Sequence, residues 1–379
     1  MSEKIKVAFV KFGGLSSGGI EKHIQTIATS LPPDLFEVDF FYTKGAPLIG
    51  TDWVHPTTDP VRKEFMENSH VNLIYVEVEA RENRFGPPYE WINTNFWDLF
   101  DEEKYDIVQT ARTGYREYPF CEMEDAIIVD GLHGDQIDIR SNIEKYVFLS
   151  EFQRDGWLRN GGIKEKSVII PPLIKVPPKK PSTLRKDLGI GGDVLLYGMH
   201  QADRDDIFSM IPLKAYKEIE ENGVDGRGDI RSMYVLLGGS KNYRTQAEEL
   251  GLENVIFLDF NSDPEYIHNF IAGLDIYTHG RHDGEVCSSS IIEALYHGKP
   301  VITHPGTNMG HGEQIRGCGF MAPAMWEYCK AMRDYANPDT RKLLSERCIE
   351  KYKSEYSFET ALQKYIDLYT QITKEKRDE

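Results

Sequence analysis

Two glutamates, Glu285 and Glu293, enclose seven residues in the stretch RHDGEVCSSSIIEALYHGKPVITHP, and three of those seven are consecutive serines. A strand-like run, DIYTHG, precedes the first glutamate, and a helix-like run, SSSIIEALYHG, contains the second. The amides at a helix start carry partial positive charge that suits phosphate, and carboxylates accept hydrogen bonds from alcohols. We therefore expect the backbone of Ser288 and Ser289 to contact phosphates while the two carboxylates bind hydroxyl-bearing sugars on either side.

The same residues have a second interpretation that involves no ligand. Ser290 and Glu293 fit a capping box, in which the glutamate only accepts a hydrogen bond from the N-cap amide of its own helix. Glu285 is then a solvated charge on a loop. Both interpretations place a helix start among the serines, so they differ in what the two carboxylates contact.

A glycine-rich loop forms a second candidate site near the N-terminus. The stretch FVKFGGLSSGGIEKH joins a strand-like run to a helix-like run, and Gly18 and Gly19 open that helix. Glycines let a phosphate approach the backbone closely. The stretch lacks the Gly-Lys-Ser/Thr of a Walker A loop and does not match Gly-x-Gly-x-x-Gly in register, so a dinucleotide fingerprint is not supported. A flexible surface turn is the alternative.

Strand-like and helix-like runs alternate along the whole chain, which favours parallel sheets with helices on both faces. The expected strands lie at 4–10, 36–43, 71–78, 105–110, 125–134, 145–150, 193–199, 232–239, 254–260, 275–280 and 300–305. The expected helices lie at 19–31, 209–223, 245–252, 264–274, 288–298 and 357–379. The last one begins near Ser357 and has an apolar stripe at Ala361, Tyr365, Leu368 and Ile372.

Five prolines interrupt this alternation within residues 167–190, which indicates an interdomain linker. We therefore expect two Rossmann-like α/β domains facing across a cleft, at 1–170 and 171–356. The C-terminal segment 357–379 is expected to pack back on the first domain. Ligands of open α/β sheets bind outside the carboxyl ends of the strands, so the cleft is the expected site.

The composition limits the class of partner. The formal net charge of −17 disfavours nucleic acid, since such a surface repels a phosphate backbone. The chain has an odd number of cysteines, five, and no two of them have Cys-x-x-Cys spacing. This pattern is typical of reduced thiols in an intracellular protein. No apolar run is as long as a membrane span. We expect a cytoplasmic monomer or homodimer, at most peripheral to membranes. Linker lysines could contact anionic lipid, but a solvated linker explains them better.

Several of these stretches together resemble one known family. Glu285-x7-Glu293 followed by AL-Tyr-HGKPVI is similar to the signature of retaining glycosyltransferases of family 4, which have the GT-B architecture. GGIEKH resembles the opening of that family's N-terminal domain, and VFLSEFQRDGWLRNGGIKEKSVIIPPLI resembles its crossing segment. The stretch from NVIFLDF to DIYTHG also resembles the region before the family's acidic pair. The resemblance spans nearly the whole chain.

The resemblance implies a role for each candidate residue. Glu285 would contact hydroxyls of the donor sugar, Glu293 would contact the nucleotide ribose, and His133 would lie beside the donor sugar. Gly19, next to Gly18, would approach the diphosphate from the other domain. The amides that would contact the diphosphate are those of Val286, Cys287, Ser288 and Ser289. Taken alone, a residue such as His133 is more often a structural histidine.

The chain departs from the family pattern in its phosphate-binding side chains. The family usually has Gly-Arg after the first strand of its second domain, and a lysine about six residues on. Here Met199 follows Gly198, and Asp205 stands at the lysine position. We expect Arg204 to supply the missing charge through its bidentate fork, with Lys241 as a second cation. Alternatively, Arg204 is a surface residue paired with neighbouring aspartates.

The resemblance implies a retaining, metal-independent hexosyltransferase that uses a nucleotide-diphosphate sugar as substrate and needs no cofactor. Glu285, Arg204 and His133 are the expected catalytic residues. GDP-mannose is slightly preferred as donor, ahead of UDP-glucose and UDP-N-acetylglucosamine. The acceptor would be a glycan or another hydroxyl compound bound by the N-terminal domain, where aromatic residues could stack on sugar rings: Trp53, Tyr89, Trp91 and Trp97. A sugar-nucleotide epimerase and a catalytically silent nucleotide-sugar-binding protein are the alternatives.

Overall fold

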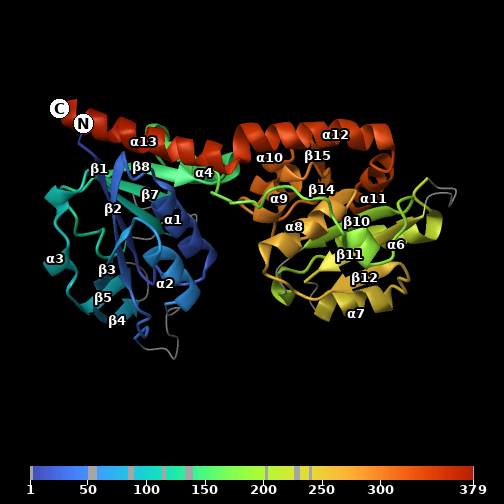
Figure 1. Ribbon diagram of the computed structural model, residues 1–379, viewed down its shortest axis with the longest axis horizontal. Helices are drawn as coiled ribbons and strands as arrows, with labels where there is room; N and C mark the ends of the chain where they lie inside the picture. The colour runs from blue at the N-terminus through green and yellow to red at the C-terminus, as the bar shows by residue number, and fades with distance from the viewer. Residues whose placement is uncertain are drawn as a thin grey trace. The chain divides into compact units, whose positions relative to one another are not determined.

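The computed structural model describes residues 3–49, 58–83, 89–112, 117–132, 140–200, 204–225, 231–238 and 241–378. The chain divides into two compact units, which are coloured by residue number in Figure 1. Unit 1 comprises Met1–Leu173 and Ala361–Glu379, and unit 2 comprises Ile174–Thr360. Each unit is an α/β structure built on a parallel sheet.

The described part of unit 1 contains a seven-stranded sheet with the order β3-β2-β1-β6-β7-β8-β9. All of its neighbouring strands pair in parallel. The strands are β1 (Ile5–Lys11), β2 (Phe36–Thr43), β3 (Asn72–Val76), β6 (Ile107–Arg112), β7 (Ile128–Leu132), β8 (Ile143–Phe148) and β9 (Ser167–Ile169). The strand order reverses direction between β1 and β6, which is where such sheets bind ligands.

Helix α1 (Gly19–Ser30) has a buried apolar face that includes Ile24 and Ile27, and Leu31, the residue after the helix, is buried as well. The other helices of unit 1 that precede the linker are shorter. They are α2 (Pro60–Glu67), α3 (Phe96–Leu99), η1 (Glu102–Lys104), α4 (Glu151–Arg159) and η2 (Lys164–Lys166).

The sequence of residues 81–97, RENRFGPPYEWINTNFW, predicts a long, aromatic-rich loop, but part of it forms a hairpin. Strands β4 (Val78–Asn83) and β5 (Tyr89–Thr94) pair antiparallel and form a small separate sheet. Trp91 lies in the core of unit 1, where its ring contacts those of Phe12 and Phe96. The loop prediction was wrong here because buried aromatic residues, rather than turn residues, dominate this segment.

Helix α13 (Phe358–Asp378) carries the C-terminal segment into unit 1. Ser357 begins the helix as predicted, since its hydroxyl accepts a hydrogen bond from the Thr360 amide at 3.1 Å. The stripe that was predicted at Ala361, Tyr365, Leu368 and Ile372 is buried throughout. The neighbouring Tyr369 donates a hydrogen bond to Gln109 of β6 at 2.6 Å, so this helix packs on the N-terminal unit.

The described part of unit 2 contains a six-stranded sheet with the order β12-β11-β10-β13-β14-β15. Its strands are β10 (Leu195–His200), β11 (Ser232–Leu237), β12 (Val255–Leu258), β13 (Ile276–Thr278), β14 (Val301–Thr303) and β15 (Gly319–Met321). Numbered from β10, this is the 3-2-1-4-5-6 order of Rossmann folds, with the reversal between β10 and β13. Tyrosines such as Tyr197 and Tyr234 fill the core beside aliphatic side chains.

The helices of unit 2 mostly follow the predicted apolar periodicity. Helix α6 ends as predicted at Gly223, which adopts a φ of 76° that favours glycine. The helices are α5 (Leu184–Asp187), η3 (Asp205–Ile207), α6 (Ile211–Asn222), α7 (Lys241–Glu249), α8 (Pro264–Gly273), α9 (Ser289–Tyr296), α10 (Gly310–Gln314), α11 (Met325–Asp334), α12 (Pro338–Lys351) and η4 (Tyr352–Tyr356). Within the described ranges, no helix combines the length and apolar character needed to cross a bilayer.

Candidate functional site

The candidate site lies at the carboxyl ends of β10 and β13, where the strand order of unit 2 reverses. His200 is the last residue of β10, and His279 directly follows β13. The next residues form the loop that carries Glu285 to the start of α9. This topology places Glu285 on a loop and Glu293 inside the helix, as the sequence predicted.

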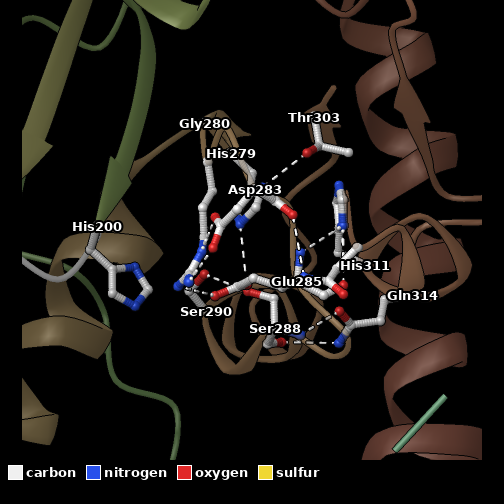
Figure 2. A network of polar contacts seen from close by, with 12 residues as sticks. His200, His279, Gly280, Asp283, Glu285, Ser288, Ser290, Thr303, His311 and Gln314 are labelled. Atoms are coloured by element: carbon white, nitrogen blue, oxygen red, sulfur yellow. Dashed lines mark hydrogen bonds and ion pairs between the residues drawn. The ribbon is translucent and has the colours of Figure 1, made fainter. Parts of the chain in front are cut away.

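Glu285 is held by basic side chains of its own loop (Figure 2). Its Oε2 lies 3.3 Å from Nε2 of His279, and its Oε1 accepts from Nη1 of Arg281 at 3.2 Å. Burial alone would raise the pKa of Glu285, but the hydrogen bond and charge of His279, a hydrogen bond from Ser288 and the charge of Arg281 hold that pKa at about 2. The side chain keeps 23% of its surface exposed. The alternative of a freely solvated loop charge is therefore wrong, and Glu285 is an ionised group fixed in place.

The backbone around Glu285 is equally fixed. His311 of α10 holds it from both sides, because its amide donates to the Glu285 carbonyl at 3.0 Å and its Nδ1 lies 3.2 Å from the Glu285 amide. Gly284 has a φ of 66°, and a Cβ there would stand 1.8 Å from the carbonyl oxygen of Asn308. Only glycine fits this position, so the loop path that aims Glu285 depends on it.

Helix α9 begins at Ser289, one residue after the start that the sequence predicted. Ser288 is the N-cap residue, and its side chain makes no capping hydrogen bond. The Ser288 amide donates to Oε1 of Gln314 at 2.7 Å, and Nε2 of Gln314 donates to the Ser288 carbonyl at 2.9 Å. The expectation that this amide is open for phosphate is therefore wrong, because a buried glutamine already binds it.

Other amides of this turn remain open. Among the described residues, no acceptor contacts the backbone N–H groups of Val286, Cys287, Ser289 or Ser290. Such groups at a helix start need an acceptor from water or a ligand. Cys287 lies here as a thiol, since burial raises its pKa.

Glu293 contacts histidines rather than the start of its own helix. Its Oε2 lies 2.9 Å from Nε2 of His200, and its Oε1 lies 3.9 Å from Nε2 of His268. The capping-box interpretation is wrong, because the N-cap is Ser288 rather than Ser290. Glu293 and Glu285 are therefore each held by an imidazole, from His200 at the end of β10 and from His279 after β13.

The predicted cations differ in their surroundings. Arg204 is 62% exposed and forms a two-point ion pair with Asp206, which raises the Arg204 pKa further. This is the surface pairing that the sequence left open as an alternative. Lys241 is the exposed first residue of α7. Arg281 is the cation that contacts Glu285 itself, and it also pairs with Asp283 at 2.7 Å.

The remaining predicted residues lie in unit 1. Gly18 is the N-cap of α1 and Gly19 its first residue, where an added Cβ would meet nothing within 4 Å. The buried Gln25 fixes the preceding loop by donating to the carbonyls of Gly14 at 2.6 Å and Ser16 at 3.0 Å. His133 lies outside the described residues. The loop before α1 is therefore held by buried hydrogen bonds from Gln25 and is not a flexible surface turn.

The aromatic residues proposed for sugar stacking are only partly tested. Trp91 is 5% exposed and serves the core, whereas Trp97 is 38% exposed. Trp53 and the side chain of Tyr89 lie outside the described residues. Across the described ranges, no cluster of three or more His, Cys, Asp or Glu side chains is arranged to hold a metal ion. The expectation of a metal-independent reaction stays a prediction.

The sequence alone missed the side chains that fix the two glutamates. His279 and Arg281 could have been identified from the sequence, because both lie in the six residues before Glu285. His200 could have been found as the residue at the end of the first strand of unit 2. His311 and Gln314 carry no local signal, since each acts on a residue 26 positions away.

Comparisons with known proteins agree with this geometry. Residues 212–317, which include both glutamates, match the family described as glycosyl transferases group 1. No curated protein matches the sequence. Among solved structures, a glycosyltransferase from Rickettsia africae is 16% identical, with a TM-score of 0.68 over 97% of this chain and 98% of the other. Anabaena HepE in complex with UDP and glucose is 17% identical, with a TM-score of 0.64 over 97% and 99%.

A third similar structure is sucrose-phosphate synthase from Thermosynechococcus elongatus, which is 15% identical with a TM-score of 0.67 over 97% of this chain and 99% of the other. At such identities the likeness concerns the fold alone. The chain has the two-unit α/β fold of GT-B glycosyltransferases. Together with the match of residues 212–317, this fold supports a glycosyltransferase.

Proposed function

We propose that the protein is a retaining glycosyltransferase that transfers a hexose from a nucleotide-diphosphate sugar to a hydroxyl acceptor. The observation that carries this proposal is the N-terminus of α9, where open amides lie between two fixed carboxylates. A diphosphate on the amides of Ser289 and Ser290 would place its sugar at Glu285 and its ribose at Glu293. The single pattern thus provides a partner for each part of a sugar nucleotide.

The chemistry required is separation of the anomeric carbon from the diphosphate. Negative charge builds on the leaving diphosphate while the sugar becomes positively charged. Preorganised amides stabilise the first, and the ionised Glu285 stabilises the second. Arg281 lies 3.2 Å from Glu285 and offers a cation beside the same turn, in addition to Arg204 and Lys241. We propose that the reaction uses no metal ion and no cofactor.

The donor is proposed as a class rather than a compound. GDP-mannose, UDP-glucose and UDP-N-acetylglucosamine all present the same diphosphate and ribose. The fold likeness to HepE, whose structure contains UDP and glucose, supports testing UDP-glucose early. A glycan or glycoconjugate acceptor bound by unit 1, with the exposed Trp97 as one contact, completes the proposal, and we place the reaction in the cytoplasm.

The test begins with a calorimetric screen of six nucleotide sugars, followed by turnover of any donor that binds. Glu285→Gln keeps the shape of the side chain but removes its charge. We expect kcat to fall about 100- to 1,000-fold, the usual cost of losing one charge-stabilising group. Nucleoside diphosphate affinity should change less than about threefold, because Glu285 contacts the sugar and not the nucleotide.

Glu346→Gln is the matched control, since Glu346 is an exposed residue of α12 and not of the loop or helix that carries Glu285 and Glu293. It should leave both quantities unchanged. Turnover by Glu285→Gln at the wild-type rate would show that the residue has no role in transfer.

A silent nucleotide-sugar-binding protein is the second candidate. One observation favours it: Met199, at the family's arginine position, is 1% exposed and packs in the core of unit 2. Position 199 therefore supplies no cation for the phosphates. Donor binding without turnover, with every acceptor class tested, would favour this candidate. Interconversion of two sugar nucleotides without an acceptor would instead indicate an epimerase.

A further inference from the structure

Imidazoles contact Glu293 from two different elements. His200 approaches from the end of β10, and its Nε2 lies 2.9 Å from Oε2 of the carboxylate. His268 approaches from α8, with its Nε2 3.9 Å from Oε1. The three side chains keep only 13%, 18% and 7% of their surface exposed, in the order His200, Glu293 and His268. A largely buried carboxylate is thus held between two imidazoles from different elements.

The protons of this group can be assigned because a carboxylate only accepts hydrogen bonds. His200 therefore donates through Nε2. The Tyr277 hydroxyl donates to the His200 carbonyl at 3.1 Å and lies 3.2 Å from Nδ1 of the same ring, so Tyr277 holds His200 in place. On the other side, Nδ1 of His268 lies 2.8 Å from Nε2 of His297. Burial lowers the pKa of His268, and it lowers that of His297 to about 3, so both rings are neutral at neutral pH.

Two neutral rings share one proton across that 2.8 Å contact. If His297 donates, His268 points its remaining N–H at Glu293. The rings of His200 and His268 therefore face the same carboxylate, and Tyr277 and His297 contact these rings from behind. This arrangement fixes the rotation of the carboxylate and leaves its outward lone pairs for a ligand.

We propose that His200 is a positioning residue that aims Glu293 at the ribose hydroxyls and so makes the site select ribonucleotides over deoxyribonucleotides. The inference rests on the proposed function, because it assigns the ribose to Glu293. A fixed carboxylate discriminates strongly: a ligand without the hydroxyl leaves half-buried lone pairs without a partner. A mobile carboxylate would turn to water and lose that discrimination.

The test compares ligands that differ only in the ribose. The probes are UDP and GDP, their 2′-deoxy and 2′,3′-dideoxy forms, and inorganic pyrophosphate, all measured by calorimetry on the full chain. For the base that binds, wild type should favour the ribose form over the dideoxy form by roughly 10-fold or more, the usual worth of hydrogen bonds to a charged group.

Three variants separate positioning from folding. His200→Gln places an amide N–H where Nε2 stands, whereas His200→Asn keeps a polar group only near the position of Nδ1. The exposed His70 of unit 1 provides the control His70→Ala. We expect the ribose preference to fall below about threefold in His200→Asn and to be largely restored in His200→Gln. Pyrophosphate affinity should stay within about twofold in every variant, and thermal melting checks that each one folds.

The outcomes distinguish this inference from the proposed function. If wild type binds neither UDP nor GDP, both are overturned. If wild type binds one of them and His200→Asn keeps the full ribose preference, only the role of His200 is overturned. Loss of pyrophosphate affinity together with ribose preference would also overturn it, since His200 would then support the fold of the site as a whole.

Discussion

The most informative perturbation for the architecture of the site is Gln314→Met. Gln314 is 1% exposed, and its amide group makes two hydrogen bonds to the backbone of Ser288, at 2.7 and 2.9 Å. Methionine has nearly the same volume but makes neither bond. The change therefore leaves the buried N–H of Ser288 without a partner while avoiding a large cavity. The Ser288 carbonyl keeps the hydrogen bond that it accepts from the Ile292 amide at 3.2 Å.

An orphaned buried N–H costs about 1–3 kcal/mol, so we expect a loss of about 1–3 kcal/mol in the free energy of unfolding. Urea denaturation followed by circular dichroism measures this loss, and Gln363→Met is the control. Gln363 bonds only to Asp367 on the exposed surface of α13, so this variant should stay within about 0.5 kcal/mol of wild type.

Nucleotide binding should weaken with Gln314→Met as well, because the turn that carries the open amides loses its anchor. A loss of stability below about 0.5 kcal/mol, with nucleotide affinity unchanged, would refute the view that Gln314 builds this turn.

Two further predictions concern the same region. Gly284→Ala should destabilise the fold by about 2–3 kcal/mol or more, since its φ is 66° and the new Cβ would stand 1.8 Å from the Asn308 carbonyl oxygen. The control is Gly192→Ala, where a Cβ meets nothing within 4 Å. This control should be nearly neutral in the same denaturation assay. Burial lowers the pKa of His304 from 6.5 to about 4, so the unfolded state takes up a proton that the folded state rejects. Stability should therefore fall between pH 6.5 and pH 4 by up to about 3 kcal/mol, and His304→Gln should flatten that slope in melts across this range; an equally steep slope in the variant would contradict the assignment.

Much of the fold was predictable because it depends on local periodicity. The apolar stripe of α1 and the glycine that ends α6 are both signals within a few residues. The β4–β5 hairpin was not predictable in the same way, since Trp91 and its neighbours follow no clear alternation and are ordered by burial against Phe12 and Phe96. A small separate hairpin of this kind depends on tertiary packing rather than on the strand propensity of its residues.

The residues of the candidate site were likewise only partly predictable from the sequence. Glu285 and Glu293 were predictable, because their spacing around a helix start is a sequence pattern. Their partners were not, since His200 and Glu293 are 93 positions apart and meet only through the sheet order. The open or occupied state of an individual amide, as at Ser288, depends on one distant side chain and has no signature in the sequence.

The most direct test of the whole account is a crystal structure of the protein soaked with a nucleotide sugar that binds in the calorimetric screen. We predict phosphate oxygens within hydrogen-bond distance of the Ser289 and Ser290 amides, the sugar hydroxyls at Glu285 and the ribose at Glu293. Density for the diphosphate away from the start of α9, or a ribose that does not contact Glu293, would contradict the account.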